Sequence, residues 1–168
     1  MTDRPRTIFS GYVRNFIFGV EDSLVSTVGL LSGIATGGMD KQAILLTGTI
    51  LIFVEAFSMG IGSYLSEQST EEYLNKKETT GRFSRTAAVI MFVSYFIAGF
   101  IPLAPYLFFS QQNAFTVSIS CSLIGLALLG ITSAKILQTS LLRGAARMFL
   151  IGGFAVLVGI IVGYIFKM

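Results

Sequence analysis

Residues 42–66, QAILLTGTILIFVEAFSMGIGSYLS, decide the fold of this chain, because the stretch is mostly apolar and contains one charged residue, Glu55. About 20 apolar residues in a helix, each rising 1.5 Å, cross roughly 30 Å of hydrocarbon. The stretch therefore predicts a membrane-spanning helix that carries a carboxylate inside the bilayer. Lys41 and Glu67 mark its two ends.

Other stretches of the chain have the same apolar character, and polar turns separate them. GGMDK at residues 37–41 ends the preceding stretch, and SQQN at residues 110–113 divides a long uncharged run between Arg85 and Lys135. We predict an all-α membrane protein, with residues 1–168 forming a single transmembrane domain. We expect five spans at about residues 12–37, 42–66, 86–109, 114–134 and 147–166, and a short charged cytoplasmic helix at residues 67–85.

The composition agrees with burial in lipid and excludes several classes of protein. Of the 168 residues, 53% are hydrophobic and 12% are charged, whereas about 25% of residues in soluble domains are charged. Histidine is absent and Cys121 is the sole cysteine. This removes histidine zinc sites, Ser-His-Asp hydrolysis and disulfide scaffolds. We expect no enzyme activity, no resident cofactor and no nucleic-acid partner.

The basic residues predict the orientation of the chain in the membrane. Lys41 and Lys167 fall on one side of the predicted spans, and the other basic residues fall on the opposite side. By the positive-inside rule, the N-terminus lies in the cytoplasm and the C-terminus outside. The residues on the cytoplasmic side are Arg4, Arg6, Arg14, Lys76, Lys77, Arg82, Arg85, Lys135, Arg143 and Arg147.

Two acidic residues and a methionine are expected to meet inside the bilayer. Inserting a carboxylate side chain into hydrocarbon costs about 2.5–3.5 kcal/mol on insertion scales. Acidic residues inside membrane spans therefore usually have a function. Asp22 lies 15 positions before Gly37 and Glu55 lies 14 after Lys41, so both stand about 21–22 Å below the shared turn. Met59 is one helical turn beyond Glu55, on the same face. Asp22, Glu55 and Met59 are therefore the candidate metal ligands.

This donor set favours a transition metal. Carboxylate oxygens combined with a soft thioether suit Fe²⁺ or Mn²⁺ better than Mg²⁺ or Ca²⁺. Two other roles stay open on this evidence: Met59 filling space between helices, as methionine most often does, and Glu55 hydrogen-bonding a neighbouring Ser or Thr. Glu21 lies about 100° around the helix from Asp22 and is not expected to bind the ion.

Four stretches, in their order along the chain, resemble the vacuolar iron transporter family of five-helix divalent-metal transporters. The resemblance covers nearly all of residues 12–166 and is typical of a short-loop member of the prokaryotic type. The stretches are GVEDSLVST at residues 19–27, EAFSMGIGSYLS at residues 55–66, IPLAPY at residues 101–106, and RGAARM at residues 143–148 leading into IGG at residues 151–153.

The resemblance implies a homodimer that exports Fe²⁺, and also Mn²⁺, from the cytoplasm in exchange for protons. It places Asp22 and Met59 at the family's aspartate and methionine along the ion pathway. Glu55 departs from the pattern, because some members carry this glutamate at the position of Leu51 and many bacterial members have one at the position of Ser63. The short loops indicate a prokaryotic plasma membrane.

Acidic residues also follow the second span. Many family members insert a glutamate-rich metal-binding module at this point, and this chain has a short segment instead. Glu67 and Glu71 share one face of a helix, and together with Glu72 and Glu78 they are candidate accessory metal ligands. A solvated charged helix, balanced by the lysines that follow, is equally compatible with the pattern.

Glycines in the first and last spans indicate close helix packing. They repeat every four residues, a spacing that lets helix backbones approach one another in lipid. Their partner is either another span of the same chain or a second subunit. The glycines are Gly29, Gly33 and Gly37 in the first span and Gly159 and Gly163 in the last.

A second function from another class stays open. In this hypothesis the chain is a non-transporting membrane subunit whose buried acids bind a basic group on a partner helix. Metal should stabilise the purified protein if the chain is a transporter, and should not stabilise it if the chain is a partner subunit.

Overall fold

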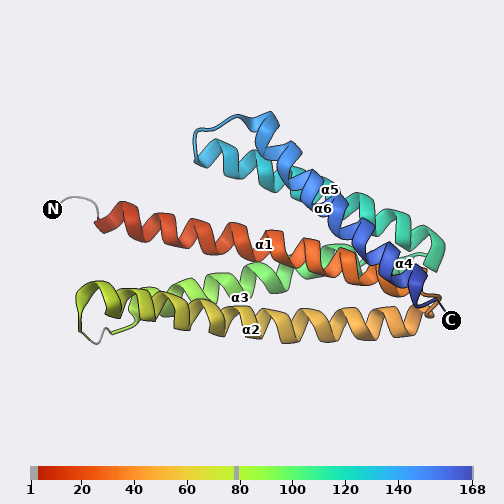
Figure 1. Ribbon diagram of the computed structural model, residues 1–168, viewed down its shortest axis with the longest axis horizontal. Coiled ribbons are helices and arrows are strands. Elements are labelled where there is room, and N and C mark those ends of the chain that lie inside the picture. Colours follow the sequence, from red (N-terminus) through yellow and green to blue (C-terminus); the bar gives the residue numbers. More distant parts are fainter. Residues whose placement is uncertain (1–3, 78–79, 168) are drawn as a thin grey trace.

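The computed structural model describes residues 4–77 and 80–167 and is all-helical over these residues. Five of its helical segments are long and apolar enough to cross a membrane, which confirms the predicted all-α membrane fold. The two chain ends lie at opposite ends of the bundle (Figure 1). The helices are α1 (Arg4–Thr36), α2 (Lys41–Asn75), α3 (Arg82–Leu103), α4 (Pro105–Phe108), α5 (Gln111–Ile136) and α6 (Leu141–Ile165).

The charged helix expected at residues 67–85 forms over its first part, as a continuation of the second span, and ends earlier than expected. Helix α2 continues without interruption to Asn75, and Lys76 ends it in the left-handed conformation with φ 50°. Gly81, with φ 62°, then precedes the start of α3. Both residues have positive φ angles, which an α-helix cannot accommodate, so the chain turns here. The charged segment is therefore an extension of α2, a turn and the first residues of α3.

Two prolines end the third span in a kinked pair of helices. Helix α3 contains Pro102 and ends at Leu103, and α4 begins at Pro105. Proline has no backbone N–H and its ring crowds the preceding turn, so a regular helix does not continue through this sequence. The span consequently breaks near its end.

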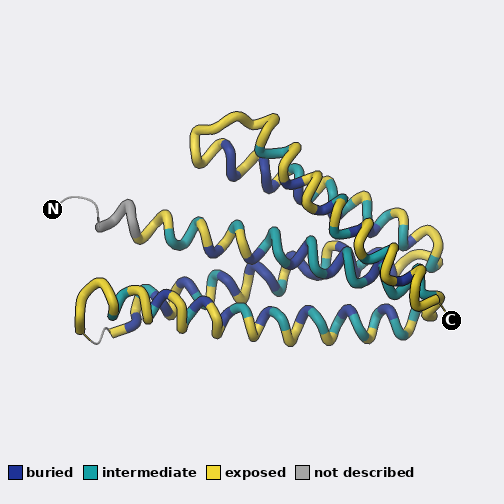
Figure 2. Tube along the Cα trace, viewed as in Figure 1, coloured by how far each residue is buried: buried dark blue, intermediate teal, exposed yellow. Residues whose placement is uncertain are grey.

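Helix α1 is at the centre of the bundle. It packs most extensively on α3 and α6, and also contacts α5 and α2. Helix α2 packs mainly on α3 and α5 mainly on α6, so the molecule has two groups of helices, with α1 common to both (Figure 1). Buried residues follow the inward faces of the helices, whereas exposed residues line the outward faces of α2 and α6 (Figure 2). Many of these exposed residues are large and apolar, as a lipid-facing surface requires.

The glycines of the first and last spans pack against each other within one chain. A Cβ atom added to Gly33 would lie 2.9 Å from the carbonyl oxygen of Gly159, and one added to Gly29 would lie 3.2 Å from that of Ala155. These positions therefore allow the backbones of α1 and α6 to touch. The question left open by the sequence is answered in favour of an intrachain contact.

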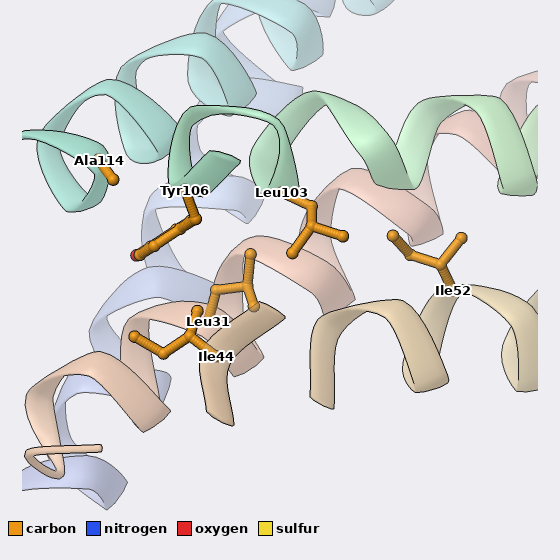
Figure 3. Packing of buried hydrophobic residues seen from close by; sticks show 6 residues of the cluster. All are labelled: Leu31, Ile44, Ile52, Leu103, Tyr106 and Ala114. Carbon is orange, nitrogen blue, oxygen red and sulfur yellow. The ribbon is translucent and has the colours of Figure 1, made fainter. Parts of the chain in front are cut away.

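One end of the bundle, which we call the turn end, contains the α1–α2 turn at residues 37–40 together with α4. An apolar cluster fills its interior and draws on α1, α2, α3, α4 and α5 (Figure 3). At the surface, Lys41 Nζ donates to the carbonyl oxygen of Phe109 at 3.1 Å, and Gln111 Nε2 donates to that of Met39 at 2.7 Å. The interior of the turn end is therefore packed and its connections are hydrogen-bonded, while a groove of about 740 Å³ runs between α1 and α6 on its surface. The cluster consists of Leu31, Ile44, Ile52, Leu103, Tyr106 and Ala114.

Candidate metal centre

Asp22 and Glu55 lie at similar depths on α1 and α2. Helices α1 and α2 run antiparallel from the turn that joins them, so residues at equal distances from the turn lie at similar depths. Both side chains are partly buried, and they lie close enough for the charge of Glu55 to act on Asp22. The structure therefore brings together the two carboxylates that residue counting places at one depth.

Tyr95 of α3 adds a hydroxyl group to the two carboxylates. Its hydroxyl lies 2.8 Å from Ser26 Oγ and is close to Glu55, whose charge acts on it. Ser23 Oγ donates to the backbone carbonyl oxygen of Tyr95 at 2.6 Å. Sequence reasoning missed Tyr95, because a tyrosine inside an apolar span has no pattern that tells whether its hydroxyl faces lipid or a polar interior.

Met59 lies between the carboxylates and a large cavity. It follows Glu55 by one turn of α2, is partly buried, and forms part of the wall of a cavity of about 900 Å³. Other wall residues come from α1, α2, α3, α5 and α6. The cavity occupies the end of the bundle opposite the turn end, which we call the cavity end. Its polar and charged wall residues are Ser10, Arg14, Asn15, Glu21, Ser63, Ser66, Glu67, Ser133 and Arg147.

A hydrogen-bonded network joins α1 and α2 along the cavity wall. Ser63 Oγ donates to Asn15 Oδ1 at 2.6 Å, and Asn15 Nδ2 donates to Glu67 Oε1 at 3.0 Å. Arg14 forms an ion pair with the same carboxylate, which is 7% exposed. On α2, residues 55, 59, 63 and 67 follow one another at four-residue intervals. A row of polar or sulfur-containing side chains thus runs along α2 from the cavity end to the two carboxylates.

The structure does not gather the accessory candidates into one site. Glu67 faces the interior, where it binds Arg14 and Asn15. Glu71 Oε2 accepts a hydrogen bond from Ser84 Oγ at 3.0 Å, and Glu72 Oε1 accepts one from Gln68 Nε2 at 2.9 Å. Over residues 4–77 and 80–167, no three His, Cys, Asp or Glu side chains group as metal ligands. Glu78, the fourth candidate, lies outside the residues that the structure describes.

Glu21 takes a different place from its neighbour Asp22. It forms part of the cavity wall together with Arg147 of α6, and the charges of these two residues interact. Glu21 therefore shares the cavity wall with Met59.

Comparison with known proteins identifies the family. The sequence profile of the VIT family matches residues 13–86 and 77–164 of this chain. The chain belongs to the VIT family. The family resemblance that the sequence motifs indicate is thereby confirmed, and because VIT members are metal transporters, this protein is a metal transporter and not an enzyme.

A curated relative supports the same assignment. The chain is similar to vacuolar iron transporter homolog 4 of Arabidopsis thaliana, with 26% identity over 153 residues. The matched region covers 84% of this chain and 77% of the plant protein. Because the match spans most of both VIT proteins, it concerns the transmembrane bundle as a whole.

Proposed function

We propose that this VIT protein exports Fe²⁺, and also Mn²⁺, from the cytoplasm in exchange for protons. The observation that carries the proposal is the pairing of Asp22 and Glu55, two carboxylates on different helices, next to a cavity whose wall includes Met59. The name of the plant relative, an iron transporter homologue, supports iron as the cargo.

The donor chemistry supports a divalent transition metal as substrate. Two carboxylates supply charge that balances a dication, and hard oxygen ligands alone suit Mg²⁺ or Ca²⁺. The thioether of Met59 is a soft donor one turn away from Glu55 on the same helix, and it favours softer ions such as Fe²⁺. In this proposal Asp22, Glu55 and Met59 contact the ion directly.

The cavity of about 900 Å³ supports entry of the ion from the cavity end of the bundle. With the orientation set by the basic residues, the cavity end is cytoplasmic and the turn end is external. The ion then enters past Glu67 and Ser63 and reaches Met59 through the cavity. Release on the far side requires movement of the apolar cluster at the turn end, next to the break between α3 and α4. Such alternating access is typical of secondary transporters.

Proton exchange follows from placing two carboxylates together. In a site of low dielectric constant, two neighbouring negative charges repel strongly. Either a divalent ion or protons relieve this repulsion, so the two cargoes compete for Asp22 and Glu55. Protons that enter from the external side then displace the metal, and arriving metal displaces the protons.

We propose a homodimer in a prokaryotic plasma membrane. The family resemblance supports the dimer, and the short connections between helices support the membrane assignment. Cross-linking of the purified protein in lipid tests the dimer, and a fluorescent fusion expressed in the source organism tests the membrane.

Uptake of metal by reconstituted vesicles tests the proposed function. Asp22→Asn and Glu55→Gln should each abolish Fe²⁺ uptake and the accompanying proton flux, with the helical content unchanged. Asp40→Asn is the matched control, because Asp40 is exposed at the α1–α2 turn and asparagine replaces it well as a helix N-cap. Undiminished transport by both site variants would refute the ligand assignment. Absence of metal-dependent stabilisation in the wild type would favour the non-transporting subunit instead.

A further inference from the structure

The hydroxyl group of Tyr95 lies where α1, α2 and α3 meet beside the two carboxylates. The residue is 0% exposed, and its hydroxyl is 2.8 Å from Ser26 Oγ on α1. The same hydroxyl is close to Glu55 on α2 and to Asp22 on α1, and the charges of both act on it. One phenol group therefore links the two helices that carry the acidic ligands.

The hydrogen-bonding capacity of these groups allows Tyr95 to bond Ser26 and Glu55 at the same time. A hydroxyl donates one hydrogen and accepts through its lone pairs, whereas an ionised carboxylate only accepts. With Ser26 as the donor to the Tyr95 oxygen, the hydrogen of Tyr95 is left for Glu55. A hydrogen bond to an ionised acceptor is shorter and stronger than one between neutral groups. Such a bond holds one oxygen of Glu55 and leaves the other for an ion.

The packing of α2 explains why Glu55 needs this support. Helix α2 contacts α3 much more extensively than it contacts α1, although Asp22 is on α1. The orientation of Glu55 towards Asp22 therefore depends on α3. Tyr95 is an α3 residue whose side chain reaches Glu55 and α1 together.

We propose that Tyr95 is a positioning residue of the metal centre, whose hydroxyl holds the Glu55 carboxylate so that it faces Asp22. The inference rests on the proposed function, since it assigns Tyr95 a role in presenting two ligands to a divalent ion. Tyr95 acts through Glu55 and is not itself a ligand. Its loss weakens ion capture more than it slows the movement of an ion already bound, because the two acids no longer start from the binding geometry.

A separate contact keeps α1 and α3 together when the hydroxyl is removed. Ser23 Oγ donates to the backbone carbonyl oxygen of Tyr95 at 2.6 Å, and a phenylalanine at position 95 retains that carbonyl and the aromatic ring. Tyr95→Phe thus removes the proposed function of the hydroxyl and preserves the packing. Tyr106→Phe is the matched control, because Tyr106 is also buried, at 1% exposed, and lies in the apolar cluster at the turn end.

The test is initial-rate Fe²⁺ uptake under anaerobic conditions by vesicles that contain the full-length wild type, Tyr95→Phe or Tyr106→Phe. Tyr95→Phe should raise the KM for Fe²⁺ by about tenfold, the effect expected for loss of a hydrogen bond to a charged group. Its maximal rate should stay close to that of the wild type. Tyr106→Phe should leave the KM unchanged. Melting temperatures of all three proteins, measured in parallel, separate loss of stability from loss of positioning.

The outcomes distinguish this inference from the proposed function. If the wild type takes up Fe²⁺ and Tyr95→Phe has the same KM, the inference about Tyr95 is overturned and the proposed function stands. If the wild type takes up no Fe²⁺, the inference and the proposed function are both overturned. If Tyr95→Phe does not fold, Ser26→Ala and Ser23→Ala replace it. Ser26→Ala should raise the KM several-fold, whereas Ser23→Ala should lower the melting temperature at unchanged KM. A Ser26→Ala protein with the wild-type KM overturns the inference.

Discussion

Replacing Gly33 by alanine places a methyl group where α1 touches α6. The added Cβ would lie 2.9 Å from the carbonyl oxygen of Gly159, a separation that real Cβ atoms essentially never show. The obstructing atom belongs to the backbone and cannot rotate away, so the two helices must separate by several tenths of an ångström. Overpacking of this kind typically costs about 1–3 kcal/mol.

Gly153→Ala is the matched control for this change. Gly153 is on α6, and a Cβ at this position would meet nothing within 4 Å. Both variants gain about 1 kcal/mol of helix propensity from the exchange of glycine for alanine. The difference between them therefore isolates the contact between α1 and α6.

Thermal unfolding in detergent, followed by circular dichroism at the helical band, measures this difference. For a chain of this size, each kcal/mol shifts the melting temperature by about 2–4 °C. The melting temperature of Gly33→Ala should thus lie about 2–12 °C below that of Gly153→Ala. Equal values, or a more stable Gly33→Ala protein, would show that the glycines of α1 do not pack on α6 of the same chain.

Three further predictions concern the cavity wall, the apolar cluster and the ion. Asn15→Ala should lower the free energy of unfolding by about 1–3 kcal/mol, because buried Glu67 and Ser63 both lose a partner; chemical denaturation measures this, and an unchanged midpoint would contradict the network. Leu31→Ala should lower the free energy of unfolding by about 2–5 kcal/mol, since Leu31 is fully buried in the apolar cluster. If chemical denaturation shows a smaller loss for Leu31→Ala than for Leu46→Ala, a change at an exposed position, the packing of the cluster is contradicted. Fe²⁺ at 100 times its dissociation constant should stabilise the wild type by about 2.7 kcal/mol and should not stabilise Asp22→Asn; an equal rise in the melting temperature of both proteins would argue against Asp22 as a ligand.

The sequence predicts the membrane spans well, because each depends on a local property. Charge-free stretches of sufficient length locate the spans, and the polar segments at residues 37–41 and 110–113 separate them. The depth of Asp22 and Glu55 is also predictable, since two helices joined by a short turn rise equally per residue. Their interaction in the structure follows from that counting.

Contacts between distant residues are not predictable in this way. Glu67 is charged and follows an apolar stretch, so the sequence suggests a solvated position, yet it is buried by Arg14 and Asn15 from α1. Tyr95 occupies an apolar span whose polar face has no periodic signal, and its role depends on Ser26, which is 69 positions away in sequence. The end of α2 at Lys76 depends on a left-handed backbone conformation that lysine seldom adopts.

A double-mutant cycle on Fe²⁺ binding tests the central claim, that Asp22 and Glu55 hold one ion together, most directly. Binding of Fe²⁺ to the purified wild type, Asp22→Asn, Glu55→Gln and the double variant gives the coupling between the two positions. If the acids share the ion, each single change lowers the affinity by about tenfold or more, and the double change costs much less than the product of the two losses. Losses that multiply independently, or wild-type affinity in either single variant, would contradict the shared site.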